Sequence, residues 1–273
     1  MPSNDTFKLL GAAAAGTLAL TACGGGDDDA ETQGMLLEEG TLQVCSDLPY
    51  PPFEYYDEDG EIVGFDIDIA QEIADELDAE LEVIASSFDG IQSGVALNAQ
   101  DCDMAISGMT ITEEREENML FSDPYLDDNL GLLAASDAGV GSLEDLDGVT
   151  VGVQQATTGA DYALEEGYEV REYEDSGLLI QGLESGQVDA AIGNISILGY
   201  QAGEDDAFTF VEEIDTGEQL GIAVQQDNTE LHEEINAILA DMDLEEIEER
   251  WFHEGDTPEE GDAEDAGDEE EDD

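Results

Sequence analysis

The sequence predicts an α/β protein with two lobes, each built on a parallel sheet. Segments with the pattern of buried strands alternate with segments of helical periodicity along most of the chain. Such alternation is typical of parallel sheets whose strands are joined by helices. The alternation restarts near residue 149, and the roughly 220 residues between the two ends are enough for two small units. We therefore expect two α/β lobes.

The expected elements follow from these patterns. Strands are predicted at 41–46, 80–86, 102–107, 131–135, 149–154, 169–174, 188–193, 208–212 and 220–225. Helices are predicted at 67–77, 89–98, 158–166, 177–186, 195–203, 228–241 and 244–252. The first helix carries one apolar stripe from Ile67 to Leu77. We interpret Asp59-Gly60 as a hairpin turn, because a calcium loop would need an acid where Tyr55 stands.

The N-terminus has the features of an export signal. Lys8 precedes an apolar run that is too short and too rich in Ala and Gly for a membrane-spanning helix. The run ends in Leu-Thr-Ala-Cys23, which resembles the cleavage box of bacterial lipoproteins. Residues 1–22 are predicted to be a signal peptide and Cys23 a lipidation site that anchors the protein outside the cell membrane. The alternative is a plain signal peptide with an incidental cysteine.

Acidic residues dominate both ends and the surface. Residues 23–34 form a Gly- and Asp-rich tether, and residues 254–273 form an acidic tail that is predicted to be disordered. The formal net charge is −70, and such self-repulsion disfavours a compact state in dilute buffer. Concentrated salt screens it, so the composition indicates a saline habitat. Disorder of the whole chain is disfavoured by its 41% patterned hydrophobic content, and nucleic acid is excluded as a partner.

Two cysteines remain in the folded region. Cys45 is predicted late in its strand and Cys102 at the start of another. Four residues of offset between parallel strands correspond to about 13 Å, whereas a disulfide needs Cα atoms within about 7 Å. The sequence therefore weighs against a bond between them.

Arg115 is one of few cations, since only Lys8, Arg171 and Arg250 accompany it. It ends the segment "SGMTITEER", which follows a predicted strand. Two interpretations stand open. Arg115 forms a surface ion pair with a nearby Glu, which contributes little stability, or it holds an anion that the protein must bind. In open α/β sheets ligands lie beyond the carboxyl ends of strands, which favours the second.

Several motifs together carry a resemblance to a known family. They are "SDLPYPPFEYYDEDGEIVGFDIDIAQEIADEL", "FDGI", "SGMTITEER", "FSDPYLD", "VGVQQATTGADYA" and a final "WF", in this order. The chain resembles the extracellular solute-binding proteins of family 3, the polar-amino-acid receptors of ABC importers. The resemblance implies the type II periplasmic-binding fold. Its lobes would be 35–124 plus 221–253 and 130–215, joined by crossing segments near 125–129 and 216–220.

The resemblance also implies a binding site for a zwitterion. Arg115 matches the arginine that grips the ligand's carboxylate, as a guanidinium does well. Thr110 matches a threonine that reaches the ligand, and Ser107 and Gly108 match positions that offer backbone groups. Thr158 would add a second hold on the carboxylate at a helix N-terminus, unless it is only an N-cap.

The remaining site residues would read the body of the ligand. Tyr50 and Phe88 match two aromatics that sandwich its side chain, although core packing is the alternative. Asp47 would favour an amide or a cation, and Gln154 lies where the family varies. Asn194 stands where the family usually has an Asp for the α-ammonium. That departure leaves a compatible solute such as ectoine as an alternative ligand, held partly by cation–π contact.

Other functions are weighed against a receptor. An enzyme of this fold, such as a dehydratase, would need a tuned acid or base in the cleft, but neither histidine follows a strand. No nucleophile motif is visible, and a fused sensor would need a signalling segment after residue 252. We expect no cofactor and no metal. The expected partners are the small ligand, an ABC permease and, through the lipid, the membrane, with the protein itself a monomer.

Overall fold

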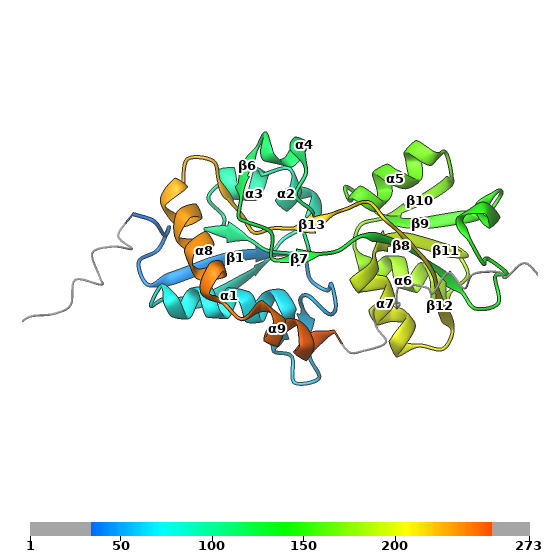
Figure 1. Cartoon of the computed structure of the whole chain (residues 1–273), viewed down its shortest axis with the longest axis horizontal. Coiled ribbons are helices and arrows are strands. Elements are labelled where there is room, and N and C mark those ends of the chain that lie inside the picture. Colours follow the sequence, from blue (N-terminus) through cyan, green and yellow to red (C-terminus); the bar gives the residue numbers. More distant parts are fainter. Residues whose placement is uncertain (1–33, 253–273) are drawn as a thin grey trace, which may run out of the picture. The chain divides into compact units, whose positions relative to one another are not determined.

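The computed structural model describes residues 34–252, so the predicted signal peptide, Cys23 and the acidic tail lie outside the described residues. Two five-stranded sheets form the described part (Figure 1). The first sheet has the strand order β4 (Glu80–Ala85), β1 (Thr41–Ser46), β5 (Met104–Ala105), β14 (Ala223–Gln225) and β6 (Met119–Phe121). The second has the order β10 (Glu169–Tyr173), β9 (Thr150–Gln154), β11 (Ala190–Asn194), β8 (Leu130–Ala135) and β12 (Phe208–Ile214).

Each sheet combines parallel strands with antiparallel ones. In the first sheet β1 pairs in parallel with β4 and β5, whereas β14 runs antiparallel to β5 and β6. In the second sheet β9 pairs in parallel with β10 and β11, and β8 runs antiparallel to β11 and β12. The two-lobed α/β fold is confirmed. The antiparallel pairs involve β14 in the first sheet and β8 in the second.

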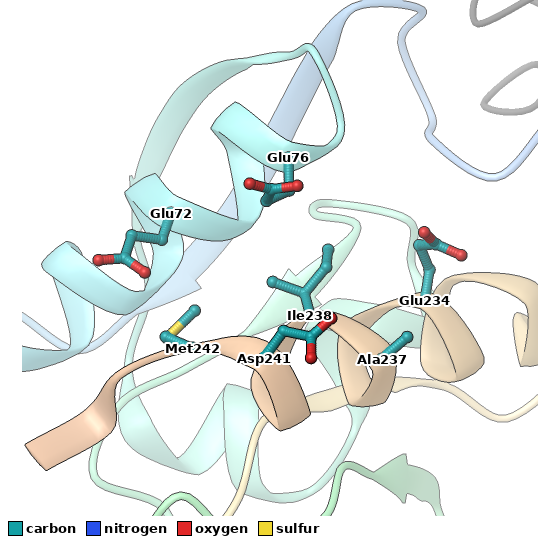
Figure 2. Close-up of a pocket in the computed structure, with 7 residues that line it drawn as sticks. All are labelled: Glu72, Glu76, Glu234, Ala237, Ile238, Asp241 and Met242. Atoms are coloured by element: carbon teal, nitrogen blue, oxygen red, sulfur yellow. The ribbon is translucent and has the colours of Figure 1, made fainter.

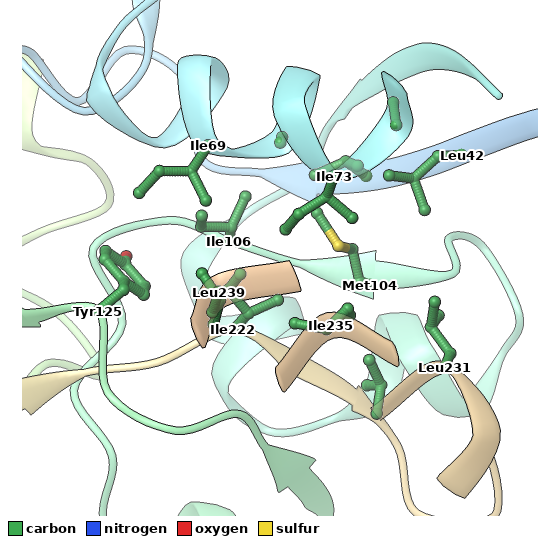
Figure 3. Close-up of a cluster of buried hydrophobic side chains, with 14 of the residues drawn as sticks. Leu42, Ile69, Ile73, Met104, Ile106, Tyr125, Ile222, Leu231, Ile235 and Leu239 are labelled. Carbon is green, nitrogen blue, oxygen red and sulfur yellow. The ribbon is translucent and has the colours of Figure 1, made fainter. Parts of the chain in front are cut away.

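Helices cover both faces of the first sheet. α1 (Phe65–Glu76), α8 (Thr229–Asp241) and α9 (Leu244–Trp251) pack over one face, where Leu42 and Val44 point. In Figure 3, Ile73 of α1 and Ile235 of α8 point toward Met104 of β5, which is fully buried. α2 (Phe88–Gln92) and α3 (Val95–Asn98) cover the other face. The alternation of strand residues between two faces thus produces two separate apolar clusters.

The second sheet is covered in the same way. α5 (Thr158–Glu166) packs on the face that Val151 and Val153 share. α6 (Ser176–Glu184) and α7 (Ile195–Glu204) pack on the opposite face, against Leu133 and Val188. The first residue of α5 follows β9 closely, so this helix begins at the carboxyl end of a central strand.

Two short strands connect the sheets. β7 (Leu126–Asp127) and β13 (Gln219–Leu220) pair with each other in antiparallel fashion. Figure 1 shows them side by side in the segments that link the two sheets. The backbone N–H of Asp128 also donates to the carbonyl of Glu218, at 3.0 Å. The two predicted crossings therefore form one two-stranded ribbon.

Several predicted elements differ in detail from the observed ones. The predicted helix 89–98 is two helices, because Gly94 between them has a φ of 74°, in the left-handed region that favours glycine. The predicted strand 220–225 is interrupted, with β13 in the crossing and β14 in the first sheet. β2 (Tyr55–Tyr56) and β3 (Ile62–Val63) pair as a hairpin around Asp59-Gly60, as predicted.

The expectation against a Cys45–Cys102 disulfide is wrong. The two residues are bonded, with Cα atoms 5.7 Å apart. The expectation placed Cys102 inside a strand beginning at residue 102, but β5 begins at Met104. Cys102 lies in the turn before it and packs with Cys45 in the cluster under α2 and α3. The distance expected between the two cysteines used the rise per residue of an extended strand, and this rise does not apply to Cys102.

Loss of this disulfide should lower the free energy of unfolding of the protein. The bond links residues 57 positions apart, and the loop-entropy model gives about 4 kcal/mol for a closed loop of that size. The double variant Cys45→Ser/Cys102→Ser should lose free energy of unfolding of this order in denaturant titrations in concentrated salt. Wild type treated with a reductant should show the same loss. Equal stability of reduced and oxidised protein would contradict the prediction.

Candidate functional site

The predicted site residues meet where the carboxyl ends of strands from the two sheets face each other. Gln154, the last residue of β9, donates from Nε2 to Asp47 Oδ2 at 2.8 Å. The Tyr50 hydroxyl donates to Asn194 Oδ1 at 3.5 Å. Ser176 Oγ of α6 donates to the carbonyl of Pro49 at 2.9 Å. Residues more than 100 positions apart in sequence thus contact one another directly at this cleft.

Arg115 is buried, with only 5% of its surface exposed. Its Nη1 donates to the carbonyl of Thr110 at 2.7 Å, and its Nη2 donates to the carbonyl of Ala156 at 3.1 Å. The guanidinium carbon lies 5.3 Å from the centre of the Phe88 ring. Thr112 holds the backbone in place by capping α4 (Glu113–Glu116), since its hydroxyl accepts from the Arg115 N–H.

No carboxylate pairs with Arg115 in residues 34–252. The ion pair found in that part of the chain joins Arg250 to Asp68. Burial lowers the pKa of the Arg115 guanidinium, and the negative charge of Glu218 is the largest effect in the opposite direction. The interpretation of Arg115 as a surface ion pair is therefore wrong. A buried cation with no bonded anion is an arrangement suited to a negatively charged ligand group.

Two predicted threonines bind the same carboxylate. The Thr110 hydroxyl donates to Glu218 Oε2 at 2.9 Å, and the Thr158 hydroxyl donates to the same oxygen at 2.8 Å. Thr157, not Thr158, is the N-cap of α5, because its hydroxyl accepts from Ala160 N. Thr158 is therefore free of the capping role that was its alternative interpretation. Sequence reasoning missed Glu218, which no motif distinguishes from the many other acids.

Ser107 and Gly108 each donate a hydrogen bond to a buried carboxyl group. The Ser107 hydroxyl donates to Glu54 Oε1 and accepts from the Asp47 N–H. The Gly108 N–H donates to Asp66 Oδ2 at 2.7 Å, so its carbonyl is the backbone group that is left for a ligand. Gly108 has a φ of 49°, and a Cβ there would lie 2.7 Å from the Tyr50 ring. Glycine is therefore required by both conformation and space.

Three buried carboxyl groups form an acidic floor around Tyr50, namely Glu54, Asp66 and Asp128. Burial raises the pKa of Glu54 well above its usual range and raises the pKa values of Asp66 and Asp128 to about 7. Each of the three has one oxygen without a hydrogen-bond partner. Buried acids with raised pKa values cluster at functional sites.

Asp47 and Asn194 add polar groups to the same region. Burial raises the pKa of Asp47 to about 6, although the hydrogen bond from Gln154 acts in the opposite direction. Asn194 Nδ2 donates to the carbonyl of Asp128 at 3.2 Å, which turns its Oδ1 toward Tyr50. Asn194 therefore presents an acceptor, although it lacks the charge of an Asp.

The two predicted aromatics occupy different ends of the cleft. Phe88 contacts Arg115, whereas Tyr50 stacks against Phe53 with ring centres 5.8 Å apart. A cavity of about 160 Å³ borders Arg115, Thr158 and Gln92, and a cavity of about 20 Å³ lies beside Tyr50, Asn194 and Ser176. Among the predicted site residues, Arg115 and Thr158 border the first of these cavities, and Tyr50, Gln154 and Asn194 border the second.

A separate acidic cavity lies away from these residues. It measures about 340 Å³ and is bordered by Glu72 and Glu76 of α1 and by Glu234 and Asp241 of α8 (Figure 2). No predicted site residue lines it, and no group of three or more metal-type ligands is found in residues 34–252. We therefore place the candidate site at the cleft between the sheets. No helix of the described part is long and apolar enough to cross a membrane.

Comparison with known proteins identifies the family. The model of the bacterial extracellular solute-binding proteins, family 3, matches residues 42–254. The chain belongs to this family. The arginine-binding extracellular protein ArtP of Bacillus subtilis (strain 168) is 35% identical over 256 residues, which cover 90% of this chain and 97% of that protein.

Solved structures of the family have the same fold. The arginine-bound form of truncated ArgBP from T. maritima is 34% identical, with a TM-score of 0.72 over 78% of this chain and 99% of that one. An ancestral arginine-binding protein bound to glutamine is 38% identical, with a TM-score of 0.74 over 80% of this chain and 100% of that one. Members of the family are thus seen with two different amino acids.

The acidic floor gives a prediction for stability against pH. Asp66 and Asp128 have folded pKa values of about 7, above the ordinary value of 3.8. The folded state therefore binds more protons than the unfolded state between these values, so stability should rise as the pH falls from 8 to about 5. Melting temperatures in concentrated salt test this. Asp128→Asn should flatten the slope, and a wild-type stability that falls over this range would contradict the prediction.

Proposed function

We propose that this protein captures a cationic amino acid such as arginine outside the cell and presents it to the permease of an ABC importer. The observation that carries the proposal is the pairing of opposite charges in one cleft. Arg115 is a buried cation without a bonded anion in the described chain, and Asp47, whose pKa of about 6 leaves it ionised at neutral pH, lies in the same cleft. A zwitterion with a positive side chain complements both ends.

The carboxylate of the ligand would bind at the Arg115 end. The two guanidinium nitrogens that bond to carbonyls each keep a second N–H, which suits the planar geometry of a carboxylate. The hydroxyls of Thr110 and Thr158 lie beside it, and the N-terminus of the nine-residue helix α5 adds its dipole. Gln92, whose Oε1 lies 3.5 Å from Arg115 Nε, orients the guanidinium.

The positive groups of the ligand would bind at the other end. The carbonyl of Gly108 and the Oδ1 of Asn194 are acceptors for the α-ammonium. Asp47 would pair with the cationic side chain, with Gln154 moving aside from it. Tyr50 would pack along the apolar part of the side chain. Phe88, in contact with Arg115, would cover the carboxylate end instead of facing Tyr50 across the ligand.

The relatives support an amino acid as the ligand. ArtP and ArgBP are named for arginine, whereas an ancestral relative is bound to glutamine. We propose binding without catalysis, because the relatives are named as amino-acid-binding proteins. The proposal also includes a lipid on Cys23 that anchors the protein to the membrane, and a protein that acts as a monomer.

Asn194 favours one alternative ligand. Because Asn194 is neutral, it gives the α-ammonium no direct charge partner, and a hydrogen bond to a charged group is worth about 1.5–3 kcal/mol, against about 0.5–1.5 kcal/mol for a neutral one. A compatible solute such as ectoine, with a delocalised cation, would need no such partner. A screen by thermal shift in about 2–3 M salt separates the two, since salt at this level screens the repulsion of the acidic chain. Stabilisation by ectoine but by no amino acid would favour the alternative.

Substitution of Arg115 tests the carboxylate end. Arg115→Ala should weaken arginine binding by about a hundredfold or more, because it removes two charge-assisted hydrogen bonds. Arg115→Lys should recover part of the affinity, since it restores the charge without the planar fork. Isothermal titration calorimetry measures both. Arg171→Ala makes the same charge change at an exposed position and should bind like wild type, and unchanged affinity of Arg115→Ala would contradict the proposed site.

The pKa of Asp47 gives a pH dependence for the other end. Asp47 is half protonated near pH 6, and a bound cation favours its ionised form. Binding therefore releases a proton below pH 6, and the affinity for arginine should fall by up to about tenfold per pH unit there. The affinity for glutamine should change less. Asp47→Asn should bind arginine more weakly and show a flatter profile, so an equally steep profile in that variant would contradict the role of Asp47.

A further inference from the structure

Glu218 lies on the second crossing segment, directly before β13. Its carboxylate is half-buried, and one oxygen, Oε2, accepts hydrogen bonds from the hydroxyls of Thr110 and Thr158 at 2.9 and 2.8 Å. Thr110 belongs to the loop after β5, on the side of the first sheet, and Thr158 begins α5 on the side of the second. A single carboxylate oxygen thus connects the two lobes through two short hydrogen bonds.

The same two hydroxyls are the ones that the proposed function assigns to the ligand. A threonine hydroxyl has one hydrogen and donates to one acceptor at a time. While Glu218 accepts from Thr110 and Thr158, neither hydroxyl can donate to the carboxylate of an amino acid. The ligand and Glu218 therefore require the same donors.

Electrostatics leads to the same conclusion. Glu218 is the largest of the negative charges that favour the ionised form of Arg115, although no carboxylate lies within ion-pair distance of the guanidinium in the described chain. A second carboxylate at Arg115 would meet the repulsion of Glu218. In a partly dry cleft this repulsion is stronger than in water.

We propose that Glu218 is a built-in competitor of the ligand's carboxylate. It holds Thr110 and Thr158 together across the cleft, and an amino acid must take these hydroxyls from it in order to bind. The inference rests on the proposed function, because it assumes that the ligand's carboxylate binds at Arg115. Glu218 thereby sets the affinity of the site below what the donors alone would give, since part of the protein is held in a state that does not bind.

Substitution of Glu218 tests the competition. Glu218→Ala should bind arginine about tenfold more tightly than wild type, the factor that one charge-assisted hydrogen bond represents. Glu218→Gln keeps an acceptor without the charge and should lie between the two. The matched control is Asp215→Asn, which removes one charge from the same segment at an exposed residue with no side-chain hydrogen bond in the described chain. It should bind like wild type.

Each outcome of the titration decides the matter. Weaker binding by Glu218→Ala would show that Glu218 contacts the ligand favourably, and unchanged binding would show that it does not compete, so either result overturns the proposal. Tighter binding by Asp215→Asn to the same degree would overturn it too, because a general charge effect would then suffice. If neither wild type nor any variant binds an amino acid, it is the proposed function that fails.

The connection between the lobes has a readout that needs no ligand. Small-angle X-ray scattering of the ligand-free protein should give a larger radius of gyration for Glu218→Ala than for wild type, because the bond to Thr158 is lost and only the other hydrogen bonds across the cleft, such as Arg115 to Ala156 and Gln154 to Asp47, remain. Asp215→Asn should scatter like wild type. Identical radii for Glu218→Ala and wild type would overturn the claim that Glu218 holds the lobes together.

Discussion

The cleft depends on a buried guanidinium that the protein does not neutralise itself. Burying a charge is costly unless hydrogen bonds and an opposite charge compensate it. Arg115 donates hydrogen bonds to the carbonyls of Thr110 and Ala156 and lies against the face of Phe88, but it has no bonded anion in the described chain. In a chain with 74 acidic residues this is notable, since a carboxylate partner would be easy to place. Glu218, although it is not bonded to Arg115, supplies the largest negative charge near the guanidinium, and the proposed ligand would supply a bonded one.

At the Tyr50 end of the cleft the buried groups are acids, so negative charge must be compensated instead of positive charge. Glu54, Asp66 and Asp128 are buried together, and ionising all of them would produce strong repulsion in a region of low dielectric. Their raised pKa values mean that protons replace cations as the compensation near neutral pH. These three carboxyl groups can therefore stay buried without a cation beside them. Ser107 and Gly108, which bond to this floor, are positioned by it.

The sequence predicted what depends on local pattern and on the family motifs. It located β1 and α5 without error, and it placed Asp47, Tyr50, Gln154 and Asn194 together at strand ends. It failed where distant segments decide the outcome. The Cys45–Cys102 bond depends on where β5 begins, and the role of Glu218 depends on the ribbon that places it between two threonines. In so acidic a chain no single Glu can be distinguished by composition or spacing.

The two crossing segments for this reason contribute residues to the candidate site as well as linking the two sheets. The backbone bond from Asp128 to Glu218 places one acid from each segment side by side, and the charge of Glu218 helps to raise the pKa of Asp128. Asp128 in turn holds Ser196 and Asn194, while Glu218 holds Thr110 and Thr158. The backbone carbonyl and the carboxyl group of Asp128 therefore position residues at the Tyr50 end of the cleft, and the carboxylate of Glu218 binds two threonines beside Arg115. One acid on each crossing segment thus contacts predicted site residues, which is why the segments matter to the site although neither acid was singled out by the sequence.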